Sequence, residues 1–310
     1  MRRREFIKLV GSAAAAWPRA ARAQQADPVR RIGVLMAHPE SDPEYQSYLS
    51  AFQKELAERG WREDRNIKIE SRWGALEDPE TRERSARELL ALKPDLLLTQ
   101  NTPPTASMLQ LTRTVPVVFV VVTDPVGSGF VKSLALPGGN ATGFTIMEPS
   151  MGGKWLELLK EIAPQIRRVA LLFNPATAPY VDVYLNPFKN AAASLGLEGF
   201  PAPVHEESEF ETIFATQART PNSGLVLIPD GFLNVHRVRI TSLAAQCHLP
   251  AVYPWRYFAE IGGLLSYGAD QRDEFRLATT YVDRILKVKN QAISRPSPGK
   301  IRIGLKSEGC

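Results

Sequence analysis

Six polar residues stand where this chain is best placed to bind a small molecule. Five of them follow short apolar runs that read as β-strands, and ligands of open parallel sheets bind beyond the carboxyl ends of the strands. Hydroxyl, amide, imidazole and carboxylate groups hold a solute by hydrogen bonds and charge, without covalent chemistry. The six candidate ligand-binding residues are His38, Thr102, Asp124, Asn174, Asp230 and Tyr267.

The segment Asn101-Thr102-Pro103-Pro104 reads as the start of a helix. Asn is a favoured N-cap, and Pro is favoured at the first helical position. A helix N-terminus presents free N–H groups and the positive end of the dipole, which suit a carboxylate, and the Thr102 hydroxyl adds another donor. We expect this loop to bind a carboxylate; plain N-capping is the alternative.

Two acids follow strands in different halves of the chain. Asp124 comes after the apolar run that ends at Val122, and Asp230 comes after residues 227–229. Each could pair with a ligand ammonium group, with a role in the following turn as the alternative. Asn174 follows a strand in the same half as Asp230. A helix end for a carboxylate, facing an acid across a cleft, would suit a zwitterion such as an amino acid.

The remaining candidates are rings. His38 follows the first strand and could touch a ligand, although a loop-capping role is the favoured interpretation. Tyr267 lies in a glycine-rich run and could line a cleft or pack there. Tyr253 and Trp255 could stack on an aromatic ligand, but packing is favoured for both.

Residues for catalysis, metal binding or phosphate binding do not form a recognisable pattern. Gly152-Gly153-Lys154 lacks the other parts of a P-loop, and Gly127-Ser128-Gly129 is too short for a nucleophile elbow. The four histidines lack metal-ligand spacing. We therefore expect no catalytic residues, no metal and no cofactor, so the chain is predicted to be a binding protein rather than an enzyme.

The net charge of +5 does not indicate a nucleic-acid partner. Residues 1–23 carry six basic residues and one acid, and without them the 38 basic and 33 acidic residues become 32 of each. The remaining formal charge is zero, which leaves no excess to follow a phosphate backbone. We expect no nucleic-acid partner, and a monomer.

The first residues have the pattern of an export signal. Arg3-Arg4-Glu5-Phe6-Ile7-Lys8 resembles a twin-arginine signal, and Ala21-Arg22-Ala23 is a small-x-small cleavage site. An ordinary basic secretory signal is the alternative. The apolar run between them is shorter than the ~20 residues that span a bilayer. We expect a periplasmic protein, cleaved after Ala23, whose mature chain does not insert in the membrane.

The elements that must position the candidate residues alternate between strands and helices. Near-continuous apolar strands such as 117–122 are typical of parallel sheets covered on both faces. The pattern occurs twice, which predicts an α/β protein of two doubly wound parallel-sheet lobes joined at glycine-rich runs, residues 138–143 and 262–268. We assign 29–143 with 267–290 to an N-terminal lobe and 144–266 to a C-terminal lobe. The amphipathic helix after the second joint should pack back on the first lobe.

Several motifs in order along the chain are specific enough to identify a family. They are Thr99-Gln100-Asn101-Thr102-Pro103, Asp124-Pro125-Val126-Gly127, Pro137-Gly138-Gly139-Asn140-Ala141-Thr142-Gly143, Leu172-Phe173-Asn174-Pro175, Leu249-Pro250-Ala251-Val252-Tyr253-Pro254-Trp255-Arg256, Gly262-Gly263-Leu264-Leu265-Ser266-Tyr267-Gly268 and Tyr281-Val282-Asp283-Arg284-Ile285-Leu286. With them, the chain resembles the ABC transporter substrate-binding proteins of the tryptophan/tyrosine-transport type, which have the type I periplasmic binding fold.

This resemblance implies a solute-binding protein that traps a small molecule between two lobes and presents it to a permease and its ATPase. A ligand sensor for a membrane receptor is the alternative, an exported α/β enzyme fits less well, and a repressor's effector domain fits least. Residues 291–310 depart from the family's usual ending, and we interpret them as an atypical tail, truncated or frame-shifted.

Overall fold

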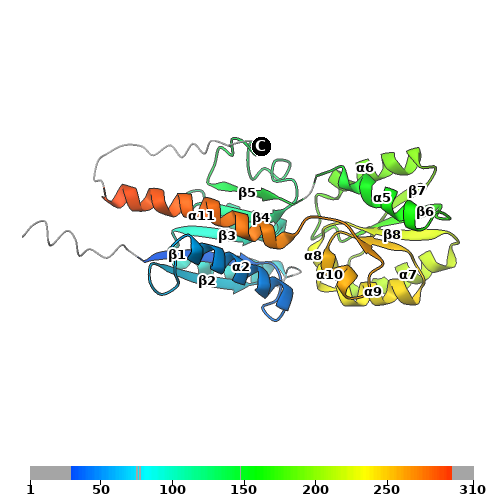
Figure 1. Cartoon of the computed structure of the whole chain (residues 1–310), viewed down its shortest axis with the longest axis horizontal. Helices are drawn as coiled ribbons and strands as arrows, with labels where there is room; N and C mark the ends of the chain where they lie inside the picture. Colours follow the sequence, from blue (N-terminus) through cyan, green and yellow to red (C-terminus); the bar gives the residue numbers. More distant parts are fainter. Residues whose placement is uncertain (1–28, 75, 77, 147, 295–310) are drawn as a thin grey trace, which may run out of the picture.

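Two parallel sheets organise the chain, as the sequence predicts. The computed structural model describes residues 29–294 except 75, 77 and 147. The first sheet has the order β2-β1-β3-β4-β5 and the second the order β10-β9-β8-β6-β7, and every pairing within them is parallel. Figure 1 shows the two sheets, each with its helices, as separate lobes side by side. The predicted signal at 1–23 lies outside the described residues, and so does the predicted tail at 291–310 apart from 291–294, which end the last described helix.

The first lobe is a doubly wound unit of five strands and four helices. Its elements are β1 (Arg30–Met36), α2 (Pro43–Glu58), β2 (Ile67–Trp73), α3 (Pro79–Ala91), β3 (Leu96–Gln100), α4 (Thr102–Leu111), β4 (Val117–Val122), β5 (Ala141–Thr145) and, from the end of the described chain, α11 (Gln271–Ser294).

Alternating side chains along β3 divide this lobe into two cores. Leu96 and Leu98 belong to the core that includes Tyr45 of α2 and Phe275 of α11. Leu97 points the other way, into the core with Met108 of α4 and residues of α3. Strands buried on both faces in this way explain the unbroken apolar runs of the sequence.

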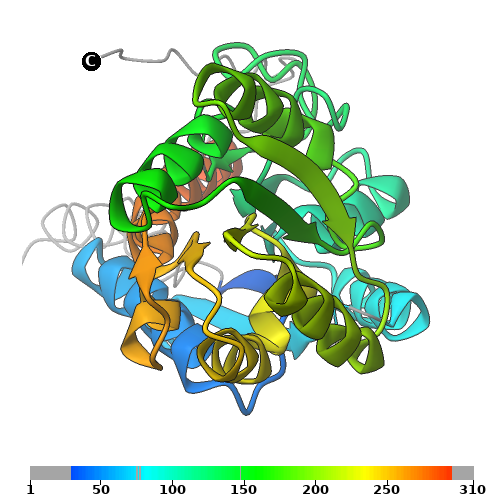
Figure 2. The same cartoon turned by 90° about the vertical axis from the view of Figure 1, so that its right-hand side faces the viewer.

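The second lobe repeats the scheme. Its elements are α5 (Met151–Ile162), β6 (Arg168–Phe173), α6 (Val181–Ser194), β7 (Glu198–Pro203), η1 (Glu207–Glu209), α7 (Phe210–Arg219), β8 (Ser223–Leu227), α8 (Gly231–Val235), α9 (Arg237–Gln246), β9 (Ala251–Tyr253), α10 (Arg256–Glu260) and β10 (Leu265–Ser266). Figure 2 views the molecule from this lobe, with α5 and α6 on one side of the sheet and α7 and α9 on the other.

The prediction that the last helix returns to the first lobe is confirmed. The Trp61 indole N–H donates to the Asp283 carboxylate of α11 over 2.8 Å, and Arg30 of β1 donates to Asn290 over 2.8 Å. The helix also packs along α2, as Figure 1 shows. Because α11 follows the second lobe, it ties the end of the second unit to the first.

The glycine-rich run at 138–143 is not itself the joint between the lobes. It leads into β5, which pairs with β4 in the first sheet and runs to Thr145. Gly143 lies so close to β4 that a Cβ there would be 2.1 Å from the Phe119 carbonyl oxygen, so glycine is required for this pairing. The chain therefore crosses between Thr145 and Met151, slightly later than the predicted boundary. The second predicted boundary, between residues 266 and 267, stays a proposal.

Candidate functional site

The carboxyl ends of the two sheets face each other at the junction of the lobes. Gly231, which follows β8, packs directly on the first lobe: a Cβ there would lie 1.7 Å from Cδ2 of Leu76 and 3.2 Å from Nδ2 of Asn101. Asn101 follows β3. The loops after β3 and β8 are therefore in van der Waals contact, and the lobes are closed on one another.

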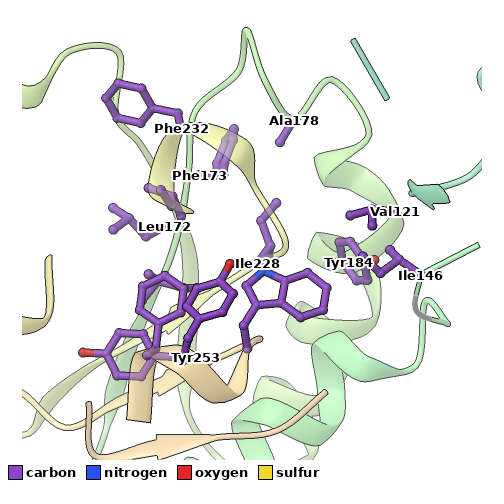
Figure 3. Packing of buried hydrophobic residues seen from close by; sticks show 14 of the residues in the cluster. Val121, Ile146, Leu172, Phe173, Ala178, Tyr184, Ile228, Phe232 and Tyr253 are labelled. Carbon is purple, nitrogen blue, oxygen red and sulfur yellow. The ribbon is translucent and has the colours of Figure 1, made fainter. Parts of the chain in front are cut away.

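Two further contacts cross the junction on the α2 side. Asp42 at the start of α2 binds Arg237 of α9 in an ion pair of 2.7 Å. The hydroxyls of Tyr45 and Tyr257 lie 3.2 Å apart and are buried. On the opposite side, Tyr184 of α6 lies beside Val121 and Ile146 of the first lobe (Figure 3). The two lobes therefore touch on both sides of the junction.

His38 lies at this junction and is buried. Its ring stacks on that of Tyr45, with centroids 3.6 Å apart and planes 10° from parallel. Burial, and to a lesser extent the Arg237 charge, lowers the pKa of His38 to about 3, so the imidazole is neutral at physiological pH. Neither ring nitrogen has a hydrogen-bond partner among the residues that the structure describes. The predicted loop-capping role is therefore not what holds this ring.

Two glutamines that the sequence analysis did not single out also have buried side-chain atoms without a described hydrogen-bond partner. Gln100 ends β3 and accepts a hydrogen bond from the Ala37 N–H over 3.1 Å, while its Nε2 has no partner in the described part of the chain. Gln271 begins α11 at the lobe junction, and both of its amide atoms are buried without a described partner. Such groups cost about 1–3 kcal/mol each when left unpaired, so a polar ligand or water that paired with them would remove that cost.

The second lobe contributes Asn234 and Trp255. Asn234 lies in α8, beside Arg237, which donates to its carbonyl over 3.0 Å. Trp255 follows β9 and precedes Tyr257, which reaches Tyr45 of the first lobe. The Asn234 Oδ1 and the Trp255 Nε1 are both buried with no partner within the described residues. A ligand between the lobes would therefore meet neutral donors and acceptors from both sides.

The backbone N–H groups at the start of α4 already have acceptors within the loop, so the predicted carboxylate site there stays a prediction without free N–H groups to support it. The Thr102 N–H already donates to the Asn101 side chain over 2.7 Å, and Pro103 and Pro104 have no N–H. The next N–H, that of Thr105, donates to the Asn101 carbonyl. The first turn of the described helix thus has no backbone N–H without an acceptor. Thr102 is buried, and its hydroxyl accepts from the Thr123 N–H over 3.3 Å.

Asp124 shapes a turn, one of its two predicted roles. Its carboxylate accepts from the Gly127 N–H over 2.8 Å, and its own φ is 46°. A Cβ on Gly127 would lie 1.9 Å from the Asp124 carboxylate, so the turn requires glycine there. The carboxylate is partly exposed. Burial raises the pKa of Tyr184, and the charges of Glu274 and Asp124 add to this effect.

Asp230 and Asn174 hold the loops of the second lobe together. Asp230 is buried and accepts from the Asn174 N–H over 2.5 Å, the Thr177 hydroxyl over 2.5 Å and the Phe232 N–H over 2.8 Å. Burial raises the pKa of Asp230 to about 6, against the opposite effect of these hydrogen bonds. Asn174 in turn accepts from the N–H of Ala176. The carboxylate therefore joins two loops of the second lobe, the one at 174–177 and the one at 230–232.

Tyr267 occupies the second crossing between the lobes. Its backbone is fixed, since its carbonyl accepts from the Trp155 indole over 2.7 Å and its N–H donates to the Tyr253 carbonyl over 2.9 Å. Its side chain is 46% exposed. Of the six predicted residues, His38, Thr102, Asn174 and Asp230 are therefore buried near the junction, whereas Asp124 and Tyr267 lie toward its edge.

Two hollows lie away from the junction. One of about 1470 Å³ on the first lobe is lined by residues of α4, by Arg113 after that helix and by the loop before β5, which includes Lys132. A smaller one of about 330 Å³ lies on the second lobe beside His248. Within the described residues there is no group of three or more His, Cys, Asp or Glu side chains that could hold a metal ion. No described helix is long and apolar enough to cross a membrane.

Comparisons with known proteins agree with this architecture. Residues 32–297 match the family model described as ABC transporter substrate binding protein. A tyrosine-binding protein of Clostridioides difficile (strain R20291) is 31% identical over 147 residues, which cover 47% of this chain and 41% of that protein. The match thus spans less than half of the curated relative.

Solved structures share the two-lobe fold. An ABC domain from Streptococcus pneumonia in complex with L-Trp is 24% identical, with a TM-score of 0.76 over 84% of this chain and 85% of that one. The ligand-free, open structure of a substrate binding protein with adhesive properties from Clostridium difficile is 22% identical, with a TM-score of 0.60 over the same shares. Together, the family match over most of its length and the paired parallel-sheet lobes show that this chain belongs to the family of ABC transporter substrate binding proteins.

Proposed function

We propose that this protein binds an aromatic amino acid between its two lobes and delivers it to an ABC permease from the periplasm. The observation that carries the proposal is the set of buried polar atoms without described partners at the junction, on His38, Gln100 and Gln271 of one lobe and Asn234 and Trp255 of the other. The tyrosine-binding relative and the L-Trp complex support the ligand class. Delivery to a permease, and export by the signal at 1–23, follow from the family.

The proposed contacts would bind both charged ends of a zwitterion through uncharged amide and indole groups. The amide N–H groups and the Trp255 indole N–H suit a carboxylate, and the Asn234 and Gln271 oxygens suit an ammonium group. Tyr45 and Tyr257 meet across the junction through their hydroxyls and bring aromatic rings to it. Within the proposal, Thr102, Asn174 and Asp230 support the two walls, because their polar atoms already bind neighbouring loops, and Asp124 and Tyr267 lie at the edges.

The test is calorimetric titration of the full chain with L-tyrosine, L-tryptophan, L-phenylalanine, L-leucine, L-glutamate, L-lysine and glucose. We expect heat with the aromatic amino acids and none with the charged amino acids or the sugar. A chain that unfolds cooperatively on heating and yet gives no heat with any amino acid would contradict the proposed ligand class.

Two substitutions that remove polar groups locate the site. Trp255→Phe removes the indole N–H and keeps an aromatic ring, and Gln271→Met removes the amide and keeps a side chain of similar length. We expect either variant to weaken binding by about three- to tenfold, the equivalent of one neutral hydrogen bond of ~1 kcal/mol. Matched controls are Trp61→Phe, which loses a hydrogen bond to α11, and Gln217→Met in α7. If the control variants weakened binding more than Trp255→Phe and Gln271→Met do, the ligand would have to bind elsewhere.

A further inference from the structure

We propose that Asp42, Tyr45, Arg237 and Tyr257 form an interlobe latch, which sets the affinity for the ligand by holding the lobes closed and His38 in position. The inference rests on the proposed function, because it concerns the same site. None of these four is assigned a ligand contact; they are positioning residues that act through closure and through His38.

The ion pair of the latch is built so that Asp42 serves both α2 and the junction. One carboxylate oxygen, Oδ1, caps α2 by accepting from the Glu44 N–H over 3.1 Å. The other, Oδ2, binds the Arg237 guanidinium of the second lobe over 2.7 Å. The two side chains are only 10% and 16% exposed, so the attraction is less screened than on an open surface.

Arg237 is held from three directions within the second lobe and across the junction. Besides Asp42, it donates to the Asn234 carbonyl, and its guanidinium lies 5.4 Å from the centroid of the Tyr257 ring. This geometry fixes the cation at the rim of the junction before and after closure. The same residue therefore connects the latch to Asn234, one of the proposed ligand contacts.

Tyr45 connects the latch to His38. Its hydroxyl meets that of Tyr257 across the junction, and its ring stacks on the imidazole. Burial raises the pKa of both tyrosines, so both hydroxyls keep their protons and can share a neutral hydrogen bond. Opening the lobes would break the hydroxyl contact and the ion pair together, while the stack within the first lobe would remain.

Contacts that exist only in the closed form contribute to affinity without touching the ligand. A protein whose binding-competent form is less populated shows a proportionally weaker apparent affinity. The latch should also slow ligand release, since the lobes must separate before the ligand leaves, and it should have little effect on the association rate. This separates it from residues that bind the ligand before closure.

The test is a double-mutant cycle on the full chain, read by the dissociation constant and the release rate for L-tyrosine and L-tryptophan. Asp42→Asn keeps a good N-cap for α2 and removes the charge. We expect Asp42→Asn, Arg237→Gln and Tyr45→Phe each to raise the dissociation constant about tenfold through faster release. The Asp42→Asn/Arg237→Gln double variant should be no weaker than either single variant. Strictly additive effects, or unchanged release rates, overturn the proposal.

A matched ion pair provides the control. Arg30 and Asp95 lie 2.9 Å apart, with exposures of 6% and 22%, entirely within the first lobe. Asp95→Asn should lower the melting temperature and leave both the dissociation constant and the release rate unchanged. If Asp95→Asn weakens binding as much as Asp42→Asn, general destabilisation explains both results and the latch is rejected.

Small-angle X-ray scattering distinguishes failure of the latch from failure of the proposed ligand. Without ligand, Asp42→Asn and Tyr45→Phe should have a larger radius of gyration than the wild type, whichever solute the protein binds. An enlarged variant with no binding of any amino acid by the wild type would reject the ligand class and keep the latch. Normal wild-type binding, with unchanged radii and unchanged affinities in the variants, would reject the latch and keep the proposed function.

Discussion

Replacing Trp155 with alanine is expected to lower the free energy of unfolding by about 3–5 kcal/mol, the range of Trp→Ala changes in protein cores. Trp155 is fully buried in α5, and its ring packs on Tyr184 with centroids 5.4 Å apart. Its indole N–H satisfies the carbonyl of Tyr267, where the chain crosses between the lobes. Alanine would leave both a cavity and an unpaired carbonyl. Urea denaturation followed by circular dichroism measures the loss.

Trp155→Phe separates the contribution of the packed ring from that of the hydrogen bond to the Tyr267 carbonyl. Phenylalanine keeps most of the ring volume and lacks the N–H, so this variant should lose a smaller part of the free energy, about 1–2 kcal/mol. A Trp155→Ala protein that unfolds at the same urea concentration as the wild type would show that the packing at the crossing is not as described.

The second large effect concerns Glu274, a buried carboxylate of α11. It accepts from the Val121 N–H over 2.8 Å, where β4 ends in an irregularity and Val121 has a φ of 58°. The charge of Glu274 also raises the pKa of Tyr184, after the larger effect of burial. Burial raises the pKa of Glu274 from 4.5 to about 7, against the lowering effect of the Val121 N–H. Ionising this group therefore opposes folding.

The direction of the pH dependence follows from this pKa. Between pH 4.5 and 7 the folded protein binds more protons at this site than the unfolded chain, so the free energy of unfolding falls as the pH rises through that range. Glu274→Gln keeps an acceptor for Val121 and cannot ionise. We expect the variant to be about 2–3 kcal/mol more stable than the wild type at pH 8, and nearly equal to it at pH 4.5.

Urea titrations of both proteins across this pH range make the measurement. Asp230 has its pKa shifted in the same direction, so a smaller slope should remain in the Glu274→Gln variant. Glu58→Gln, at an exposed carboxylate of α2, is the control and should leave the profile unchanged. A Glu274→Gln variant that is less stable than the wild type at pH 8 would contradict the prediction that the folded protein favours an uncharged Glu274.

The fold was predictable from the sequence where the periodicity and length of an apolar run indicate which side chains are buried. The unbroken apolar runs of β3 and β4 indicate parallel strands covered on both sides, and that is how they pack. Two strands lacked this signal. β5 begins after glycines, and β7 contains Pro201 and Pro203, which only an edge strand tolerates. β7 is at the edge of its sheet, where the prolines cost few hydrogen bonds.

The loops of the candidate site were predictable from the sequence, but the side-chain atoms that are free to bind a ligand were not. The rule that ligands lie beyond the strand ends leads to the loops that meet at the junction of the lobes, and their role in binding stays a prediction. The polarity of Asp230 and Asp124 does not tell whether their oxygens are free, because that depends on which N–H groups the folded loop turns toward them. Gln100 was contained in a recognised motif. Its place at the end of β3, on the face toward α2, was the available signal.

Hydrogen–deuterium exchange on the full chain, with and without saturating L-tyrosine or L-tryptophan, tests most directly whether a ligand is held between the lobes. We expect slower exchange on both sides of the junction at once, in residues 37–46 and 100–105 of the first lobe and 231–237 and 255–260 of the second. The outer hollow at 128–142 should exchange unchanged. Protection limited to one lobe, or found at 128–142 instead, would contradict binding at the junction.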